Sequence, residues 1–139
     1  MFIIVLTAIL SVNLHAQENE GETYFKKANE FFDSKDYKTA ILYCDSTILS
    51  NAGHEEAYAF RGVCKYFEKQ FSEAIKDFDL ALILVPGYAE VYFYRGLSYL
   101  ELENNKKACD DFTEAYNLGF KKAMKLIVKH CEIEENKAD

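Results

Sequence analysis

The chain has 139 residues, half of them hydrophobic, and a formal net charge of −7 at pH 7. This length accommodates one compact domain with its own core, and it is too short for a catalytic domain beside a separate binding domain. The acidic balance argues against nucleic acid or an anionic membrane as a partner, because both are bound by basic faces.

The first segment, residues 1–16, contains no Lys, Arg, Asp or Glu and carries an apolar run from Phe2 to Leu10. This run is shorter than the ~20 residues that a membrane-spanning helix needs, and a polar stretch follows Ala16. The pattern predicts a signal peptide over residues 1–16 that is cleaved after Ala16, with an uncleaved short anchor as the alternative. We therefore expect an exported protein, periplasmic or secreted, with no membrane attachment after cleavage.

The remainder repeats with a period of 34 residues from Gly21 to about Lys122. Four columns share this register: Tyr24, Tyr58 and Tyr92; Ala28, Gly62 and Gly96; Ala40, Ala74 and Ala108; Thr47, Ala81 and Ala115. Within each unit, apolar residues recur three and four residues apart on both sides of a short polar break, which predicts two amphipathic helices. The predicted breaks are Ser34–Asp36, Glu68–Gln70 and Glu103–Asn105.

This periodicity predicts an all-α fold, an α-solenoid of three antiparallel helical hairpins. The predicted units are residues 21–54, 55–88 and 89–122, separated at Asn51–His54 and Val85–Gly87. From Lys121 the third unit runs into a capping helix that ends at about Cys131 and covers the apolar face of the last hairpin. A charged tail occupies residues 132–139.

The second and third units resemble the tetratricopeptide repeat. The residues that carry the resemblance are Tyr58, Arg61, Gly62, Ala74, Phe78, Ala81 and Pro86, and then Tyr92, Arg95, Gly96, Tyr99, Ala108, Phe112 and Ala115. The first unit departs from the family pattern at Cys44, Thr47 and Ala52, and the second at Lys65. The resemblance implies a scaffold that binds other proteins.

In this family the first helix of each hairpin lines a concave groove. Carried over to this chain, the groove positions predict these partner-binding residues: Phe25, Asn29, Phe32, Phe60, Val63, Tyr66, Phe67, Phe93, Tyr94 and Leu97. Such a groove is aromatic, so the expected partner is an apolar or basic-aromatic protein or peptide. The alternative is that these rings pack against the neighbouring hairpin.

Family members that clamp the acidic C-termini of heat-shock chaperones have Lys, Arg and Asn in their grooves. This chain has Phe25, Phe60, Glu90 and Tyr94 at those places and keeps only Asn29 of the clamp. The resemblance therefore disfavours a groove that binds carboxylates.

Charged residues also recur with the period. Glutamates stand at the second position of every unit, namely Glu22, Glu56 and Glu90. They would attract Lys or Arg of a ligand, or they simply suit the first turn of a helix. Arg61 with Asp77 and Arg95 with Asp111 are predicted to form structural ion pairs within their hairpins, whereas Tyr43 stands at the matching position for Lys27.

The four cysteines form two candidate pairs, Cys44 with Cys64 and Cys109 with Cys131. Each pair would link one unit with the next helix along the chain, so disulfides are possible in an oxidising compartment. The alternative is that the cysteines are small buried hydrophobic residues. A metal site at Cys109, His130 and Cys131 is disfavoured, because adjacent residues of a helix point about 100° apart.

Enzyme motifs are missing from the sequence: it has no glycine-rich phosphate loop, nucleophile elbow or metalloprotease motif. We predict a non-enzymatic scaffold, without metal or cofactor, that binds a peptide segment of an envelope or secreted partner in its aromatic groove. The alternative is a structural subunit that self-associates as a homo-oligomer through the faces of the array.

Overall fold

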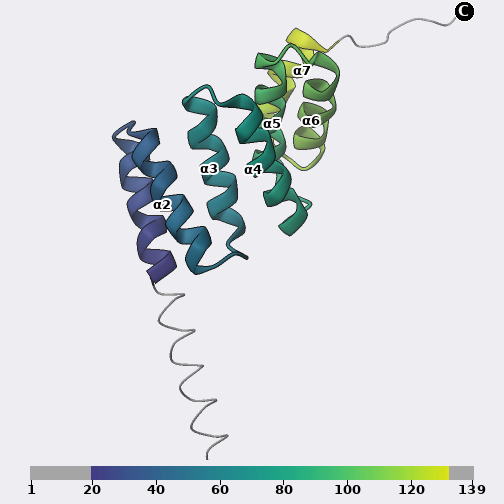
Figure 1. The fold of residues 1–139 in the computed structure, drawn as a ribbon. Helices are drawn as coiled ribbons and strands as arrows, with labels where there is room; N and C mark the ends of the chain where they lie inside the picture. The colour runs from purple at the N-terminus through teal and green to yellow at the C-terminus, as the bar shows by residue number, and fades with distance from the viewer. Residues whose placement is uncertain (1–19, 132–139) are drawn as a thin grey trace, which may run out of the picture.

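The computed structural model describes residues 20–131 (Figure 1), so the predicted signal peptide and charged tail lie outside the described residues. Residues 20–33 are helical. The following elements are α2 (Tyr37–Ser50), α3 (Glu55–Phe67), α4 (Phe71–Leu84), α5 (Ala89–Glu101), α6 (Asn105–Asn117), the 3₁₀ turn η1 (Lys121–Ala123) and α7 (Met124–His130).

The helices stack in chain order as antiparallel hairpins (Figure 1). Helix α3 packs on α4 and α5 packs on α6 within hairpins, while the contacts of α2 with α3 and of α4 with α5 join neighbouring hairpins. Helix α7 and η1 both pack on α6 and so cap the last hairpin. The prediction of an all-α solenoid of three hairpins with a C-terminal cap is confirmed.

Two predicted boundaries differ from the structure. The third break begins at Leu102 and ends at Asn104, one residue earlier than predicted, because the Asn104 side chain accepts a hydrogen bond from the Lys107 backbone N–H and starts α6 at Asn105. The capping segment is not one continuous helix, since its first three residues, Lys121–Ala123, form a 3₁₀ turn before α7.

Each hairpin turns through a residue with a left-handed backbone that is not glycine. The three residues are Lys35, Lys69 and Glu103, with φ of 64°, 60° and 58°. In the second turn, Lys69 N–H donates to Tyr66 O at 2.9 Å and Gln70 N–H donates to Lys65 O at 2.9 Å. This bonding satisfies the carbonyls at the end of α3 and is the pattern that usually has glycine at the left-handed position.

Replacing Lys69 with glycine is therefore expected to raise the free energy of unfolding by about 0.5–1 kcal/mol. Glycine removes the steric cost of positive φ, and that gain exceeds the extra chain entropy of glycine in the unfolded state. Urea unfolding followed by circular dichroism measures the change. Lys26→Gly, inside the first helix, is the control and should instead lower stability by about 1 kcal/mol; a loss of stability in both variants would contradict the assignment of strain to Lys69.

Within the second and third hairpins, a glycine on the first helix leaves space for a phenylalanine ring on the second helix. A Cβ atom added to Gly62 would lie 2.6 Å from Cε1 of Phe78, and one added to Gly96 would lie 2.7 Å from Cε1 of Phe112. Both rings are fully buried. The first unit has Ala28 and Cys44 at the matching positions, so a residue larger than glycine stands opposite one smaller than phenylalanine.

Both predicted ion pairs are present, and in each pair the arginine donates two hydrogen bonds to the aspartate carboxylate. Arg61 donates to both carboxylate oxygens of Asp77, at 2.8 Å from Nε and 2.6 Å from Nη2. Arg95 does the same to Asp111, at 2.9 and 2.7 Å. Where Lys27 replaces arginine, its ammonium lies 5.5 Å from the centre of the Tyr43 ring. These contacts fasten the two helices of each hairpin together.

Sequence reasoning missed that each arginine also reaches the preceding hairpin. Nη1 of Arg61 lies 2.6 Å from Oδ1 of Asp45, and Nη1 of Arg95 lies 2.6 Å from Oδ1 of Asp79. The two aspartates share one position in the repeat, sixteen residues before their arginine. That spacing is a signal that the sequence contains.

The cysteines behave differently in the two candidate pairs. Cys109 and Cys131 form a disulfide with their Cα atoms 5.6 Å apart, which ties the end of α7 to α6. Cys44 and Cys64 are free thiols and fully buried. The hydrogen bond to Cys64 and burial both raise the pKa of Cys44. This pair therefore fits the alternative of small buried residues, since a protonated thiol is a poor nucleophile.

Candidate functional site

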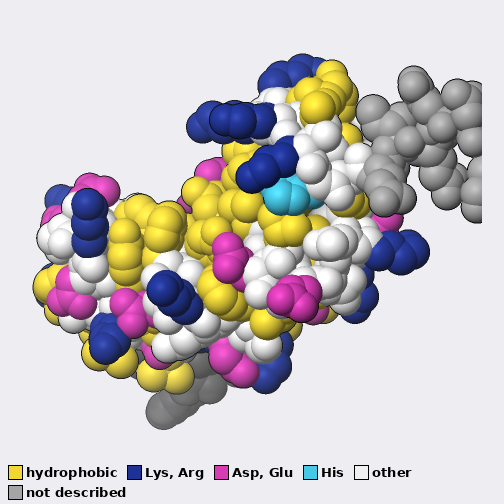
Figure 2. Space-filling model, turned by 90° about the horizontal axis from the view of Figure 1, so that it is seen from above, with side chains coloured by type: hydrophobic (Ala, Val, Ile, Leu, Met, Phe, Trp, Pro, Cys, Tyr) yellow, Lys and Arg dark blue, Asp and Glu magenta, His cyan; other side chains and the backbone are white. Residues whose placement is uncertain are grey.

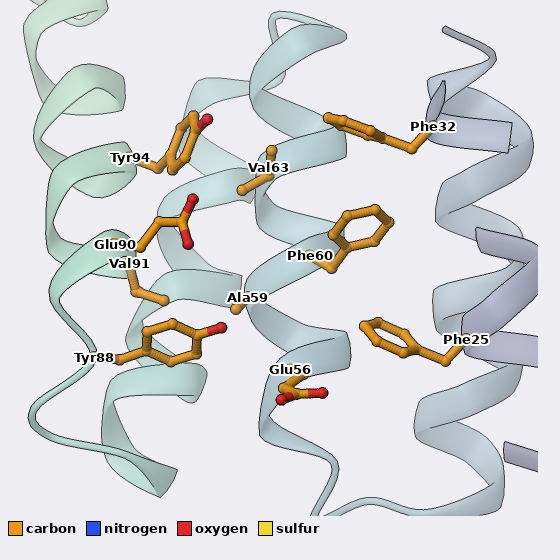
Figure 3. A pocket seen from close by; sticks show the side chains of 10 residues that line it. All are labelled: Phe25, Phe32, Glu56, Ala59, Phe60, Val63, Tyr88, Glu90, Val91 and Tyr94. Atoms are coloured by element: carbon orange, nitrogen blue, oxygen red, sulfur yellow. The ribbon is translucent and has the colours of Figure 1, made fainter. Parts of the chain in front are cut away.

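A cavity of about 350 Å³ opens between the first helices of the three hairpins (Figure 3). Its walls are mainly apolar and aromatic. The lining residues are Phe25, Phe32, Glu56, Ala59, Phe60, Val63, Tyr88, Glu90, Val91 and Tyr94. Seen from above the hairpins, hydrophobic side chains also gather in a band across the middle of the molecule (Figure 2).

The cavity exists because one position of the repeat changes size. Phe25 and Phe93 stand at this position in the first and third units, and Ala59 stands there in the second. The Phe25 ring lies 4.8 Å from the His54 ring, and the Phe93 ring lies 4.8 Å from the Phe120 ring, so each fills the space toward the segment that follows. Ala59 lacks a ring and leaves the space between α3 and α5 open (Figure 3).

Five of the ten predicted groove residues line this cavity: Phe25, Phe32, Phe60, Val63 and Tyr94. Phe60 lies at the centre of the aromatic wall, with its ring 5.6 Å from Phe25 and 5.0 Å from Phe32. Tyr94 faces this wall from α5 (Figure 3). The wall thus joins the first two hairpins, and the opposite side belongs to the third.

The other five predicted residues lie elsewhere. Asn29 donates its side-chain amide to Phe25 O at 2.8 Å. The Phe67 ring stacks on Tyr37 at 5.0 Å, and Tyr66 contacts Phe67 and Phe71. In the third unit the rings or side chains turn into the core: Phe93 packs on Phe112 and Phe120, and Leu97 packs against the same cluster. Phe93 and Leu97 therefore pack against neighbouring segments, which was the alternative interpretation of the predicted groove residues.

Five lining residues were not among the ten predicted partner-binding residues, namely Glu56, Ala59, Glu90, Tyr88 and Val91. Tyr88 precedes α5 as its N-cap residue, and Val91 lies in the first turn of α5. Both point into the cavity (Figure 3). The family resemblance assigned groove residues within the first helices alone, so it had no signal for a ring from the loop between hairpins.

Two glutamate side chains give the cavity an acidic wall. Glu56 and Glu90, in the first turns of α3 and α5, line it, and neither forms an ion pair with another residue of the described range 20–131. Burial and the carboxylates of Glu56, Glu90 and Glu55 raise the pKa of Tyr88. Burial and Glu90 likewise raise the pKa of Tyr94. An added anion would be repelled here.

Two further hollows continue from the acidic side. One, of about 220 Å³, is lined by Glu22, Asn51, His54, Glu55 and Glu56. The other, of about 440 Å³, is lined by Glu55, Glu56, Val85, Gly87, Tyr88, Ala89, Glu90 and Phe120. Glu56 lines both of them as well as the main cavity, so the three form one continuous surface.

Between residues 20 and 131, His, Cys, Asp and Glu side chains do not gather in groups of three or more that could hold a metal ion. The disfavoured site at Cys109, His130 and Cys131 is further excluded because both sulfurs are joined in a disulfide. None of the described helices is both long enough and apolar enough to cross a membrane.

Comparisons with known proteins identify the fold. No protein-family model and no curated protein matches the sequence. Among solved structures, the TPR domain of Arabidopsis OM64 is 24% identical with a TM-score of 0.77, and the match covers 82% of this chain and 98% of that one. The first TPR of Spaghetti (RPAP3), bound to the HSP90 peptide SRMEEVD, is 21% identical with a TM-score of 0.78 over 81% of this chain and 90% of that one.

The TPR2B domain of yeast Sti1, in complex with pHsp70, is 17% identical with a TM-score of 0.76 and covers 80% of this chain and 95% of that one. These similarities confirm the predicted tetratricopeptide-repeat fold.

Proposed function

Because the chain has the tetratricopeptide-repeat fold, we propose that it is a non-enzymatic scaffold that holds a peptide segment of an envelope or secreted partner in the cavity of Figure 3. The observation that carries the proposal is the open space beside Ala59, walled by rings from three successive hairpins. Its volume of about 350 Å³ lies within the usual range of ligand sites. Export to an envelope compartment follows from the predicted signal peptide.

The proposed ligand is a peptide, since the first TPR of Spaghetti, which has the same fold, is bound to an HSP90 peptide, and the TPR2B domain of yeast Sti1 is in complex with pHsp70. The peptide SRMEEVD bound by Spaghetti contains three acidic residues. In this chain Glu56 and Glu90 would repel such a sequence. The proposed ligand is accordingly apolar or basic-aromatic, with Phe60 and Tyr94 as the main contacts, because large rings bury much area at low entropic cost.

Binding should be lost when the aromatic rings that line the cavity are removed, and also when a new side chain fills the cavity. Affinity capture from envelope extract identifies the partner, and titration calorimetry with the bound segment then measures affinity. Phe60→Ala/Tyr94→Ala should weaken binding by at least about 30-fold, the value of one strong contact. Ala59→Phe should also abolish it, because a ring there occupies the space that Ala59 leaves open.

Leu49→Ala/Ile83→Ala is the matched control, since both side chains are exposed on the second helices α2 and α4 and lie outside the cavity. Circular dichroism confirms that each variant remains helical. If Ala59→Phe folds and still binds with the parental affinity, the cavity is not the site.

Self-association is a second candidate function, because the second helices expose large apolar side chains. Leu42, Leu49 and Ile83 are 64%, 89% and 74% exposed. Leu49 and Ile83 occupy the same position of the repeat. If this face assembles copies of the chain, sedimentation velocity will show a mass that rises with concentration and returns to the monomer in Leu49→Ser/Ile83→Ser. A monomeric mass across the micromolar range would exclude the assembly.

A further inference from the structure

We propose that the acidic end of the groove, formed by Glu22, Glu55, Glu56 and Glu90, receives a lysine or arginine side chain of the bound segment. This inference rests on the proposed function, because it specifies one residue of the proposed peptide.

The carboxylates line three hollows that share Glu56. Glu56 lines all three hollows, Glu90 lines two of them, and Glu22 and Glu55 line the hollow next to Glu56. A glutamate in the first turn of a helix is favoured by the helix dipole, which explains why acidic residues occur at these positions. The helix dipole does not explain why their side chains line neighbouring hollows. Three of these carboxylates also act on Tyr88: burial raises its pKa first, and the charges of Glu56, Glu90 and Glu55 raise it further. The same charges favour a cation.

The walls suit the rest of a basic side chain. Figure 3 shows Glu56 below the space between the rings of Tyr88 and Phe25, with the small Ala59 beside it. A lysine or arginine stem can lie along these rings while its charged head stays at the rim near the carboxylates. The faces of Phe25 and Tyr88 add attraction for the cation itself.

His54 supplies an independent reason to expect a peptide backbone here. Its Nδ1 accepts a hydrogen bond from the Ala57 backbone N–H at 3.2 Å, which places the proton on Nε2. The His54 residue is 8% exposed, and its Nε2 is buried without a hydrogen-bond partner in the described range. Oε1 of Glu22 lies 3.4 Å from Nε2, but their geometry completes no hydrogen bond.

The Glu22 side chain that lies over His54 is 71% exposed and free to turn outward. When Glu22 turns toward a cation of the ligand, the Nε2–H of His54 becomes available to a carbonyl oxygen. A peptide offers both groups, a basic side chain and a backbone acceptor, within a few ångströms of one another. The hollow that holds Glu22 and His54, of about 220 Å³, has room for them.

The test begins with random dodecapeptides displayed on phage and selected on four immobilised proteins: the parent, Glu56→Gln/Glu90→Gln, Phe60→Ala/Tyr94→Ala, and the control Glu30→Gln/Glu114→Gln. The control removes the same charge from exposed glutamates that line none of the three hollows. The parent and the control should enrich peptides with Lys or Arg beside apolar or aromatic residues, and the Glu56→Gln/Glu90→Gln variant should not.

The best peptide is then compared with a version in which norleucine, an uncharged side chain of similar length, replaces the selected basic residue. For the parent, fluorescence anisotropy should show a loss of about two- to fivefold for each carboxylate that pairs with the cation, and this loss should shrink as salt is added. For Glu56→Gln/Glu90→Gln the two peptides should bind equally.

Two outcomes overturn the proposal, and they differ in what they leave standing. If the parent enriches apolar peptides without basic residues, or binds the norleucine peptide as well as the basic one, the cation site is wrong while the groove stands. If the parent enriches nothing, or Phe60→Ala/Tyr94→Ala enriches the same peptides as the parent, the groove itself is wrong and the cation site falls with it.

Discussion

Replacing Asp77 with alanine is expected to lower the free energy of unfolding by about 3–5 kcal/mol. Asp77 is 2% exposed and accepts hydrogen bonds from Arg61 at 2.6 and 2.8 Å. The ammonium of Lys65 lies 2.8 Å from its Oδ2. Without the carboxylate, two cations that are each 16% exposed would face each other. The loss comes mainly from leaving Lys65 unpaired and Arg61 with only the half-exposed Asp45, since the net value of an intact buried pair is smaller.

Asp45 provides the matched control, because it contacts the same guanidinium at an equally short distance. Oδ1 of Asp45 lies 2.6 Å from Nη1 of Arg61, but the Asp45 side chain is 50% exposed. Asp45→Ala should therefore cost no more than about 1 kcal/mol, the value of an exposed ion pair. Urea unfolding at neutral pH measures both variants. Equal losses would show that burial does not decide the strength of this network.

Truncating Phe78 to alanine is expected to cost a similar amount, about 3–5 kcal/mol. The ring is fully buried in the core of the second hairpin and lies against the backbone of Gly62. Gly62→Ala should also destabilise the protein, by about 1–3 kcal/mol, because the new methyl group would lie 2.6 Å from a ring carbon. Thermal or urea unfolding of the single variants gives both values.

The two positions should be coupled. Combining Gly62→Ala with Phe78→Leu should cost less than the sum of the two single changes, because leucine vacates part of the space that the methyl group needs. The first unit, with Ala28 and Cys44 at these positions, is the natural precedent. Gly87→Ala is the control, since a Cβ atom there meets nothing within 4 Å. Strictly additive costs would contradict the matched packing of this pair.

The sequence alone determined the repeat and the contacts within each hairpin. Columns 34 residues apart fixed the number of hairpins, and the spacing of Arg61 to Asp77 predicted an ion pair that the structure contains. These features are predictable because a helix fixes which of its residues face the helix paired with it. Even so, the left-handed residue Lys69 was missed, since lysine carries no signal for positive φ.

Only the tertiary structure decided which rings remain accessible. Phe93 and Tyr94 are adjacent and were both predicted to line the groove, but only Tyr94 lines the cavity. Phe93 turns toward Phe120 and Tyr94 turns into the cavity. The cavity itself depends on how the hairpin of α5 sits against Ala59, and the field at Tyr88 depends on carboxylates from two hairpins. The period within one hairpin carries no information about that placement, because it is set by packing between hairpins.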